Sequence, residues 1–567
     1  MKISLAITAA AIAFGYVDAK TFLLPIPQSV EWTGNSASLS KDFKITGAKN
    51  PHVKDAAKRY NSLIHQEKWV PVQVPYTKQP ALGSAGTLKS LEISVKDNYA
   101  KLDIGIDESY TLDVPSKGGK ATLIAATWVG AIRGLETFSQ LVESGKHDGL
   151  IAHTAHIIDH PTYGHRGILL DTARNFYPVK DILRTIDAMA FNKMNVLHWH
   201  VTDSQSWPLY FKSHPELSEK GAYSSKEVYS PKDVETIIRY GESRGVRLIV
   251  ELDMPAHTAT IAESHPDYMA CIGEWWGDFA AEPPAGQLNP INEGAWKLVE
   301  DLIKEATHIF PDTLYHAGGD ELNTACWPKE KTIVAYAEKH NMTYNEIWFE
   351  WENKLLDFVK TQKKRSIIWE DPIKDGGSMP VDTIVQTWLA PPSTYTAKGH
   401  DVIVSNYAYF YLDCGHGGWV GDDERYISPT QQETPEDTFN YGGVGGSWCS
   451  PFKTWQRIYS YDMSFEVKDS HPGKVLGGEA ALWAEQSDYH VVDGRLWPRA
   501  SAAAEIYWSG SYDNKNQRRT VEEFQPRFLD WVYRLQSRGI NAEPVQPKWC
   551  AKHPQACDLN NPKKVAA

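Results

Sequence analysis

The sequence predicts an α/β protein whose main part is a (β/α)8 TIM barrel preceded by a small α+β domain. Three observations lead to this fold: apolar segments after Pro161 alternate with amphipathic segments, eight of them have strand length, and they are rich in Val, Ile and Leu. Parallel strands that are buried on both faces have this composition, and each needs a crossover to the next strand. A doubly wound open sheet is the second choice, because it has the same alternation.

The predicted parts follow one another along the chain. Residues 20–160 contain alternating strand patterns at 91–95 and 110–114 and helical patterns at 53–66 and 131–142. The barrel spans residues 161–510, with helical segments at 180–191, 231–243, 294–309 and 347–361. Its eight strands are predicted at 167–171, 196–200, 247–252, 313–317, 366–370, 383–388, 401–406 and 474–482. A C-terminal extension, residues 511–567, contains one further helix at 521–536.

Length and composition suit this architecture and exclude some partners. The chain has 567 residues, 42% of them hydrophobic, and 58 basic against 71 acidic side chains give a formal net charge of −13. Nucleic acids and anionic membranes both require a concentrated basic face, so we expect neither as a partner. Tryptophan (21) outnumbers phenylalanine (17), which is weak evidence for sugar binding because indole rings also fill protein cores.

Residues 1–19 have the features of a secretory signal peptide. A basic residue, Lys2, precedes an apolar stretch from Ile3 to Tyr16, and small residues lie near Ala19. No later apolar run reaches the roughly 18 residues that a membrane-spanning helix requires. We therefore expect a secreted, extracellular protein.

Six cysteines form an even set, which a secreted protein uses for disulfide bonds. We predict pairing in chain order, because each loop then stays within one local region: Cys271 with Cys326, Cys414 with Cys449, and Cys550 with Cys557. None of them has the CxxC spacing of a zinc site. Asn341 opens the sequon Asn341-Met342-Thr343 and is the predicted N-glycosylation site.

Polar residues follow every predicted barrel strand, at the edge where barrels place their reactive groups. The adjacent pair Asp320-Glu321 after the fourth strand is the most informative. Neighbouring residues on a regular strand face opposite sides, so both carboxylates reach one cavity only if the chain turns first, which Gly318-Gly319 permits. An acidic turn that caps the next helix is the non-functional alternative.

Adjacent carboxylates fit one type of glycoside chemistry. Most glycosidases place two carboxyl groups on opposite sides of the scissile bond. Two carboxylates that are adjacent in sequence can approach the bond from one side only, so they do not fit that arrangement. In substrate-assisted catalysis the sugar's acetamido oxygen attacks its own anomeric carbon. Glu321 would then donate the proton, and Asp320 would orient the amide and balance the developing positive charge.

Four segments of the chain resemble the glycoside hydrolase family 20 β-N-acetylhexosaminidases of the secreted fungal type. These segments are 134–140 (Gly-Leu-Glu-Thr-Phe-Ser-Gln), 166–174 (Arg-Gly-Ile-Leu-Leu-Asp-Thr-Ala-Arg), 316–321 (His-Ala-Gly-Gly-Asp-Glu) and 477–485 (Gly-Gly-Glu-Ala-Ala-Leu-Trp-Ala-Glu). The resemblance implies exo-acting removal of terminal, non-reducing β-linked N-acetylglucosamine, and of N-acetylgalactosamine, from chito-oligosaccharides or glycans. It also implies retention through an oxazolinium intermediate, no cofactor or metal, and a homodimer.

The resemblance also assigns roles to residues of this chain. Glu321 is the expected general acid/base, Asp320 the assisting carboxylate, and Tyr411 a hydrogen-bond donor to the acetamido carbonyl. The expected substrate-binding residues hold sugar hydroxyls (Arg174, Asp413, Glu485), wall the pocket (Trp369, Trp388, Trp483) or support the site (His257, Asp203).

Other interpretations of these residues remain open at the sequence level. Arg174 could form a structural ion pair with Asp171 or Glu485, and each tryptophan alone could belong to the core. His198 and His200 share a strand face, so a metal-dependent barrel hydrolase that adds His257 and His316 is a rival. A non-catalytic sugar-binding protein is the second rival. Residues 441–446 are a glycine-rich insertion that a Cys414–Cys449 bond would hold near the site, with Trp455 within reach.

Overall fold

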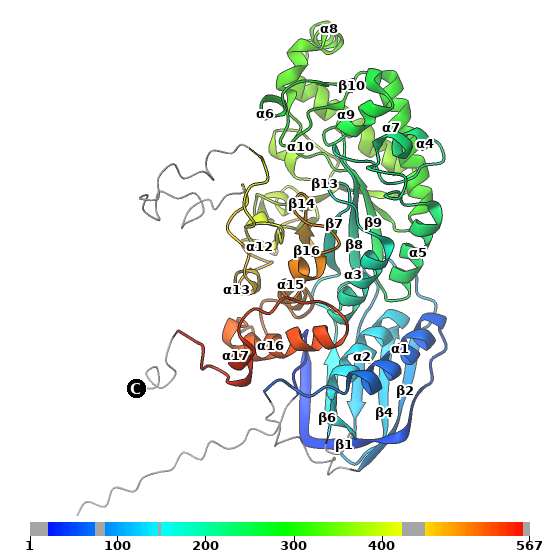
Figure 1. Ribbon diagram of the computed structural model, residues 1–567, viewed down its shortest axis with the longest axis vertical. Coiled ribbons are helices and arrows are strands. Elements are labelled where there is room, and N and C mark those ends of the chain that lie inside the picture. The colour runs from blue at the N-terminus through cyan, green and yellow to red at the C-terminus, as the bar shows by residue number, and fades with distance from the viewer. Residues whose placement is uncertain (1–20, 74–85, 146–148, 422–447, 560–567) are drawn as a thin grey trace, which may run out of the picture.

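Eight parallel strands close into a barrel in the order β12-β13-β14-β15-β16-β7-β8-β9, which confirms the predicted (β/α)8 fold. The structure is a computed structural model that describes residues 21–73, 86–145, 149–421 and 448–559 (Figure 1). The predicted signal peptide and the glycine-rich segment 441–446 lie outside the described residues. Among the residues described, no helix has both the length and the apolar character needed to cross a membrane.

Each barrel strand lies where the sequence predicts one, with ends that differ by a few residues. The strands are β7 (His165–Asp171), β8 (Val196–Thr202), β9 (Arg247–Leu252), β12 (Leu314–His316), β13 (Arg365–Trp369), β14 (Ile384–Thr387), β15 (Val402–Val404) and β16 (Val475–Leu482). β7, β8 and β9 are buried along their whole length, as expected for strands covered on both faces.

The barrel interior is filled by layers of side chains. An apolar layer near the amino ends of the strands contains Val196, Ile249, Leu314, Ile367, Ile384 and Ile403. Two residues further along five of these strands lie His198, Glu251, His316, Trp369 and Gln386. His198 contacts Glu479 (2.9 Å) and Glu251 (3.1 Å), so the second layer is held by buried ion pairs.

Helices on the outside of the barrel follow the predicted segments closely. The four predicted ones are α3 (Val179–Phe191), α5 (Pro231–Glu242), α7 (Glu293–Ile309) and α9 (Tyr344–Thr361). Ser230 with Asp233 forms a capping box at the start of α5, and Thr343 with Glu346 forms one at α9. Among the described residues of this part, the other α-helices of five or more residues are α4 (Pro215–Gly221), α8 (Lys331–His340), α13 (Trp455–Tyr459), α14 (Val492–Leu496) and α15 (Arg499–Ser509).

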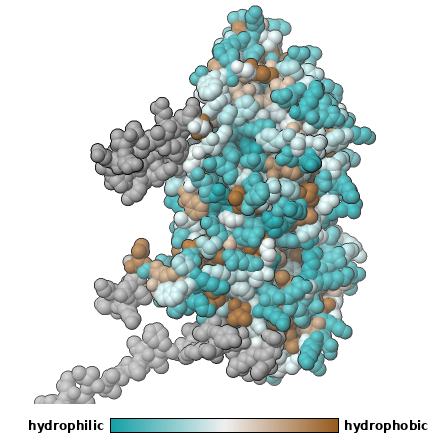
Figure 2. Space-filling model, in the orientation of Figure 1, coloured by the Kyte–Doolittle hydropathy of each residue, from teal (hydrophilic) through white to brown (hydrophobic). Residues whose placement is uncertain are grey.

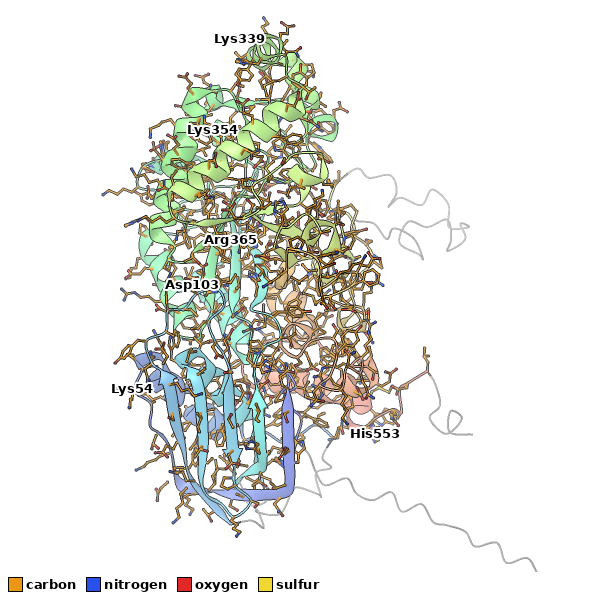
Figure 3. The ribbon with its side chains drawn as sticks, turned by 180° about the vertical axis from the view of Figure 1, so that it is seen from behind. Lys54, Asp103, Lys339, Lys354, Arg365 and His553 are labelled. Atoms are coloured by element: carbon orange, nitrogen blue, oxygen red, sulfur yellow. A yellow bond between two sulfur atoms is a disulfide. The ribbon has the colours of Figure 1, made fainter. Side chains whose placement is uncertain are left out.

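The N-terminal part forms a separate six-stranded sheet in the order β1-β2-β4-β3-β6-β5. Helices α1 (Pro51–Glu67) and α2 (Trp128–Leu141) cover one face of it (Figure 1), and the other face is turned toward the viewer in Figure 3. The strands are β1 (Ser29–Thr46), β2 (Thr87–Asp97), β3 (Tyr110–Val114), β4 (Gly119–Thr127), β5 (Val142–Ser144) and β6 (Leu150–Asp159).

Buried ion pairs join this sheet to the barrel. Glu108 accepts hydrogen bonds from Arg133 on α2 and from Arg166 on β7, each at 2.7 Å, and all three side chains are buried. Lys193 lies 2.8 Å from Asp159 in the same interface. Asp103, labelled in Figure 3 between sheet and barrel, accepts a hydrogen bond from Thr313 just before β12. Such pairs fix the two parts relative to each other.

The C-terminal extension packs across both parts. Its helix α16 (Val521–Ser537) presents Asp530 to Trp69 Nε1 (3.1 Å) and to the backbone of Val72 (2.8 Å), and a short α17 (Lys548–Lys552) follows. Trp455 stacks on Phe528 of this helix with ring centroids 4.7 Å apart. The expectation that Trp455 reaches the site is therefore wrong, because α16 holds its ring away from the barrel mouth.

Three disulfide bonds join the cysteines in chain order, the pairing predicted from the sequence: Cys271–Cys326, Cys414–Cys449 and Cys550–Cys557. Asn341 is exposed at the end of α8. Figure 2 shows hydrophilic residues over most of the visible surface, with hydrophobic residues scattered among them.

Candidate active site

A cavity of about 500 Å³ opens at the carboxyl ends of the barrel strands. Nine of the predicted site residues line it: Arg174, His257, Asp320, Glu321, Trp388, Tyr411, Asp413, Trp483 and Glu485. They come from segments more than 300 residues apart in sequence, so barrel closure is what brings them together.

The turn after β12 directs both adjacent carboxylates into this cavity. Gly318 and Gly319 have φ values of 69° and 99°, in the region that favours glycine, and Glu321 has a φ of 53°. A Cβ on Gly318 would lie 1.8 Å from Asp253 Oδ1, while the Gly319 N–H donates to that oxygen at 2.9 Å. The two glycines therefore perform the turn that the sequence argument required.

Asp320 lines the cavity and is largely buried. The residue is 9% exposed, and its Oδ1 is buried without a hydrogen-bond partner among the described residues. Burial, and next the Asp253 carboxylate, raise the pKa of Asp320 well above its usual value. A ligand that brings an N–H group or a positive charge to this carboxyl group would favour its charged form.

Glu321 is the more exposed of the pair and contacts His257. The distance from His257 Nε2 to Glu321 Oε2 is 3.4 Å, and His257 Nδ1 lies 3.2 Å from Asp203 Oδ1. Burial alone would lower the pKa of His257, but the carboxylates of Asp203 and Asp253 outweigh it and raise that pKa. His257 is therefore held as a cation that can donate to Glu321.

Asp203 does not line the cavity, which corrects its prediction as a substrate-binding residue. Its side chain is fully buried and contacts His200 (2.9 Å), Arg174 (2.9 Å) and His257. Asp203 therefore orients Arg174 and His257, the two cations that it contacts and that line the cavity.

Arg174 combines the two roles that the sequence left open. It forms structural ion pairs with Asp171 (3.2 Å) and Asp203, and its guanidinium also lies over the Trp483 ring at 5.2 Å and lines the cavity. The Glu282 carboxylate forms a further ion pair with the Arg174 guanidinium. Sequence reasoning missed Glu282, because it lies in the loop between Cys271 and Gln287 and follows no barrel strand.

Aromatic rings form the walls. Trp388, Tyr411 and Trp483 line the cavity, and Trp388 is oriented by a bond from Nε1 to Asp371 Oδ2 of 2.8 Å. Burial, with the nearby Asp320 charge, raises the pKa of Tyr411, so its hydroxyl keeps its proton and can donate.

Trp369 is buried beneath the aromatic residues that line the cavity and does not line the cavity itself. This corrects the prediction that it lines the pocket. It is 1% exposed, its Nε1 donates to Glu251 at 2.8 Å, and its ring centroid is 5.9 Å from that of Trp483. As the last residue of β13 it still points into the filled barrel interior, where it supports Trp483.

Trp448 is a cavity residue that the sequence analysis missed. It is 58% exposed, and its ring lies edge-on to Trp388 (5.6 Å) and to Tyr411 (5.9 Å). The Cys414–Cys449 bond holds it there, beside Trp276 and Trp419 at the rim. Its only sequence signal was its place next to a cysteine.

Acidic side chains outnumber basic ones in the lining of the cavity. Burial raises the pKa of Asp413 to about 7 and also raises the pKa of Glu485. Together with Asp253, Asp320, Glu321 and Glu282 they outnumber the cationic groups that line it. This arrangement favours a bound species that becomes positively charged.

Two of the four histidines of the metal-hydrolase interpretation lie away from the cavity, whereas His200 and His257 line it. Burial would lower the pKa of His198, but Glu479 and Glu251 raise it to about 9. His198 and His316 lie in the barrel interior and do not line the cavity.

Comparison with known proteins identifies the family. The catalytic-domain model of glycosyl hydrolase family 20 matches residues 163–511, and a model described as beta-acetyl hexosaminidase like matches residues 23–141. Beta-hexosaminidase 1 of Coccidioides posadasii is 39% identical, with 94% of each chain covered.

Two further similarities come from an insect and a bacterium. The chitooligosaccharidolytic beta-N-acetylglucosaminidase of Ostrinia furnacalis is 34% identical over 92% of this chain and 86% of the relative. The X-ray structure of Flavobacterium johnsoniae chitobiase matches with a TM-score of 0.72 and 25% identity, covering 92% of this chain and 73% of that one. The resemblance indicated by the sequence motifs is confirmed, and the chain belongs to glycosyl hydrolase family 20.

Proposed function

We propose that this family 20 glycoside hydrolase is an exo-acting β-N-acetylhexosaminidase. Its substrates would be N-acetylhexosamine-terminated oligosaccharides, from which it removes terminal, non-reducing β-linked N-acetylglucosamine and also N-acetylgalactosamine. The chitooligosaccharidolytic relative supports chito-oligosaccharides as one substrate class. The observation that carries the proposal is that the adjacent carboxyl groups of Asp320 and Glu321 both line the cavity, together with Tyr411.

The geometry supports a two-step reaction with the sugar as its own nucleophile. Glu321 protonates the leaving oxygen as the acetamido oxygen attacks the anomeric carbon, which breaks the glycosidic bond and forms an oxazolinium. Asp320 accepts the amide N–H and balances the positive charge, and Tyr411 donates to the acetamido oxygen. Glu321 then takes a proton from water, which opens the ring at the anomeric carbon with net retention.

Chitobiose hydrolysis followed by NMR tests substrate class and stereochemistry together. The first-formed sugar should be the β-anomer, and an aryl glucoside with a hydroxyl in place of the acetamido group should remain uncleaved. Glu321→Gln should lose most activity on unactivated substrates. Equal cleavage of the glucoside would overturn the assisted mechanism, and absence of turnover would favour a sugar-binding protein.

We also propose that the protein is secreted and forms a homodimer. Three disulfide bonds among the described residues support an oxidising compartment. Detection of the processed chain in the culture medium of its source, and a mass near twice that of the chain without residues 1–19 by light scattering, are the expected results.

A further inference from the structure

Two histidines away from the cavity occupy the same local sequence and the same backbone conformation. His214 and His265 each follow a serine and precede a proline and an acidic residue. His214 precedes α4 with φ −139° and ψ 67°, and His265 precedes a short 3-10 helix, η4 (Pro266–Tyr268), with φ −132° and ψ 62°. A following proline disfavours the helical region for the residue before it. The sequence therefore favours the same extended backbone conformation at His214 and at His265.

The two imidazoles converge on one carboxylate. Glu216 Oε1 lies 3.0 Å from His214 Nδ1 and 3.4 Å from His265 Nε2, and one ligand atom from each of the three residues lies within 4.8 Å of the others. Bonds of about 2.0–2.2 Å from tetrahedral zinc to nitrogen and oxygen place neighbouring ligand atoms roughly 3.4 Å apart. Both measured distances are close to that spacing.

The ring nitrogens that point away from this centre also have partners. His265 Nδ1 lies 2.8 Å from Ser264 Oγ, and His214 Nε2 lies 3.6 Å from Asp301 Oδ2 on α7. Metal-binding histidines commonly use their second nitrogen in this way, which fixes the ring orientation. The three side chains are 20–32% exposed, so an ion can reach them from solvent.

We propose that His214, Glu216 and His265 bind a zinc ion, with water in the fourth position. Two imidazoles and one carboxylate suit zinc, whereas magnesium and calcium prefer oxygen ligands throughout. The ion would tie α4 to the segment after β9, next to α7 (Figure 1). That segment carries His257 and continues directly into the 3-10 helix η3 (Ala259–Glu263), so the zinc braces the active-site histidine without contacting the cavity.

Zinc titration of the untagged full-length protein by calorimetry tests the site. Wild type should bind one more equivalent of Zn²⁺ than His265→Ala, and zinc should raise the melting temperature of wild type but not that of His265→Ala. Glu216→Gln keeps the side-chain shape and should weaken binding at least tenfold, which keeps the test valid if His265→Ala folds poorly. The matched control is His471→Ala, because His471 lies in a third Ser-His-Pro tripeptide but contacts Thr396 (2.9 Å).

The control should bind zinc as wild type does, and Mg²⁺ should give no shift. Unchanged stoichiometry and affinity in both His265→Ala and Glu216→Gln would overturn the proposal. Displacement of all bound zinc by N-acetylglucosamine would also overturn it, because the metal would then lie in the acidic cavity. Neither result depends on whether the protein cleaves N-acetylhexosaminides.

Discussion

Asp320 lines the cavity beside Glu321, where the proposed function places the reacting amide. Asp320→Asn keeps the side-chain shape but removes the charge that balances the oxazolinium. We expect kcat on an aryl N-acetylglucosaminide to fall roughly 10²–10³-fold, as for loss of one preorganised electrostatic group. N-acetylglucosamine should still bind by calorimetry, since the walls are intact. A variant with wild-type kcat would show that Asp320 has no role in charge stabilisation.

Single residues show where prediction from sequence succeeds and where it fails. Asp320 and Glu321 were predictable because the glycine pair and the strand end fix both position and direction. Trp369 and Asp203 were placed at the correct strand ends, but the alternation of a strand gives the side that a residue faces and not its depth in the barrel. Glu282 and Trp448 come from loops whose paths are set by disulfides, so no local pattern indicated them.

Helix α9 contributes a buried carboxyl group directly behind the catalytic turn. Glu352 accepts a bond from Trp348 Nε1 at 2.9 Å, and a Cβ on Gly319 would lie 3.2 Å from its Oε1. Its Oε2 has no partner among the described residues. Burial raises the pKa of Glu352 to about 8, so the folded protein holds this group protonated at neutral pH.

This shift gives α9 a pH-dependent effect on stability. Because the folded-state pKa is raised, the contribution is complete below the unfolded value near 4.5 and is lost as pH rises to about 8. The loss has a slope of up to about 1.4 kcal/mol per pH unit. Glu352→Gln lacks this titration. The melting temperature of the variant relative to that of wild type should therefore rise between pH 5 and pH 8. Parallel curves for the two proteins over this range would contradict the assignment.

Elements were easier to predict than their ends. The capping boxes before α5 and α9 and the Val-, Ile- and Leu-rich strands are local signals, and each predicted barrel strand and helix lies in place. β12 is shorter than predicted because the chain leaves the sheet at Gly318, where tertiary contacts with Asp253 decide the turn.

The relation between the N-terminal sheet and the barrel could not be predicted, because it depends on buried charges far apart in sequence. Arg166 and Arg133 outweigh burial and lower the pKa of Glu108, so a carboxylate lies between two guanidinium groups from different parts of the chain. Removing one partner of a buried ion pair leaves the other charge uncompensated. That loss typically costs about 3–5 kcal/mol.

Glu108→Gln should therefore destabilise the whole molecule and loosen the junction. We expect a clearly lower melting temperature and faster proteolysis between residues 97 and 110, because both arginines keep their charge inside the interface. The matched control is Glu92→Gln, which breaks the exposed pair with Lys120 (2.5 Å) and should change stability by no more than about 1 kcal/mol. Equal effects of the two substitutions would mean that apolar packing, and not the buried ion pairs, holds the sheet against the barrel.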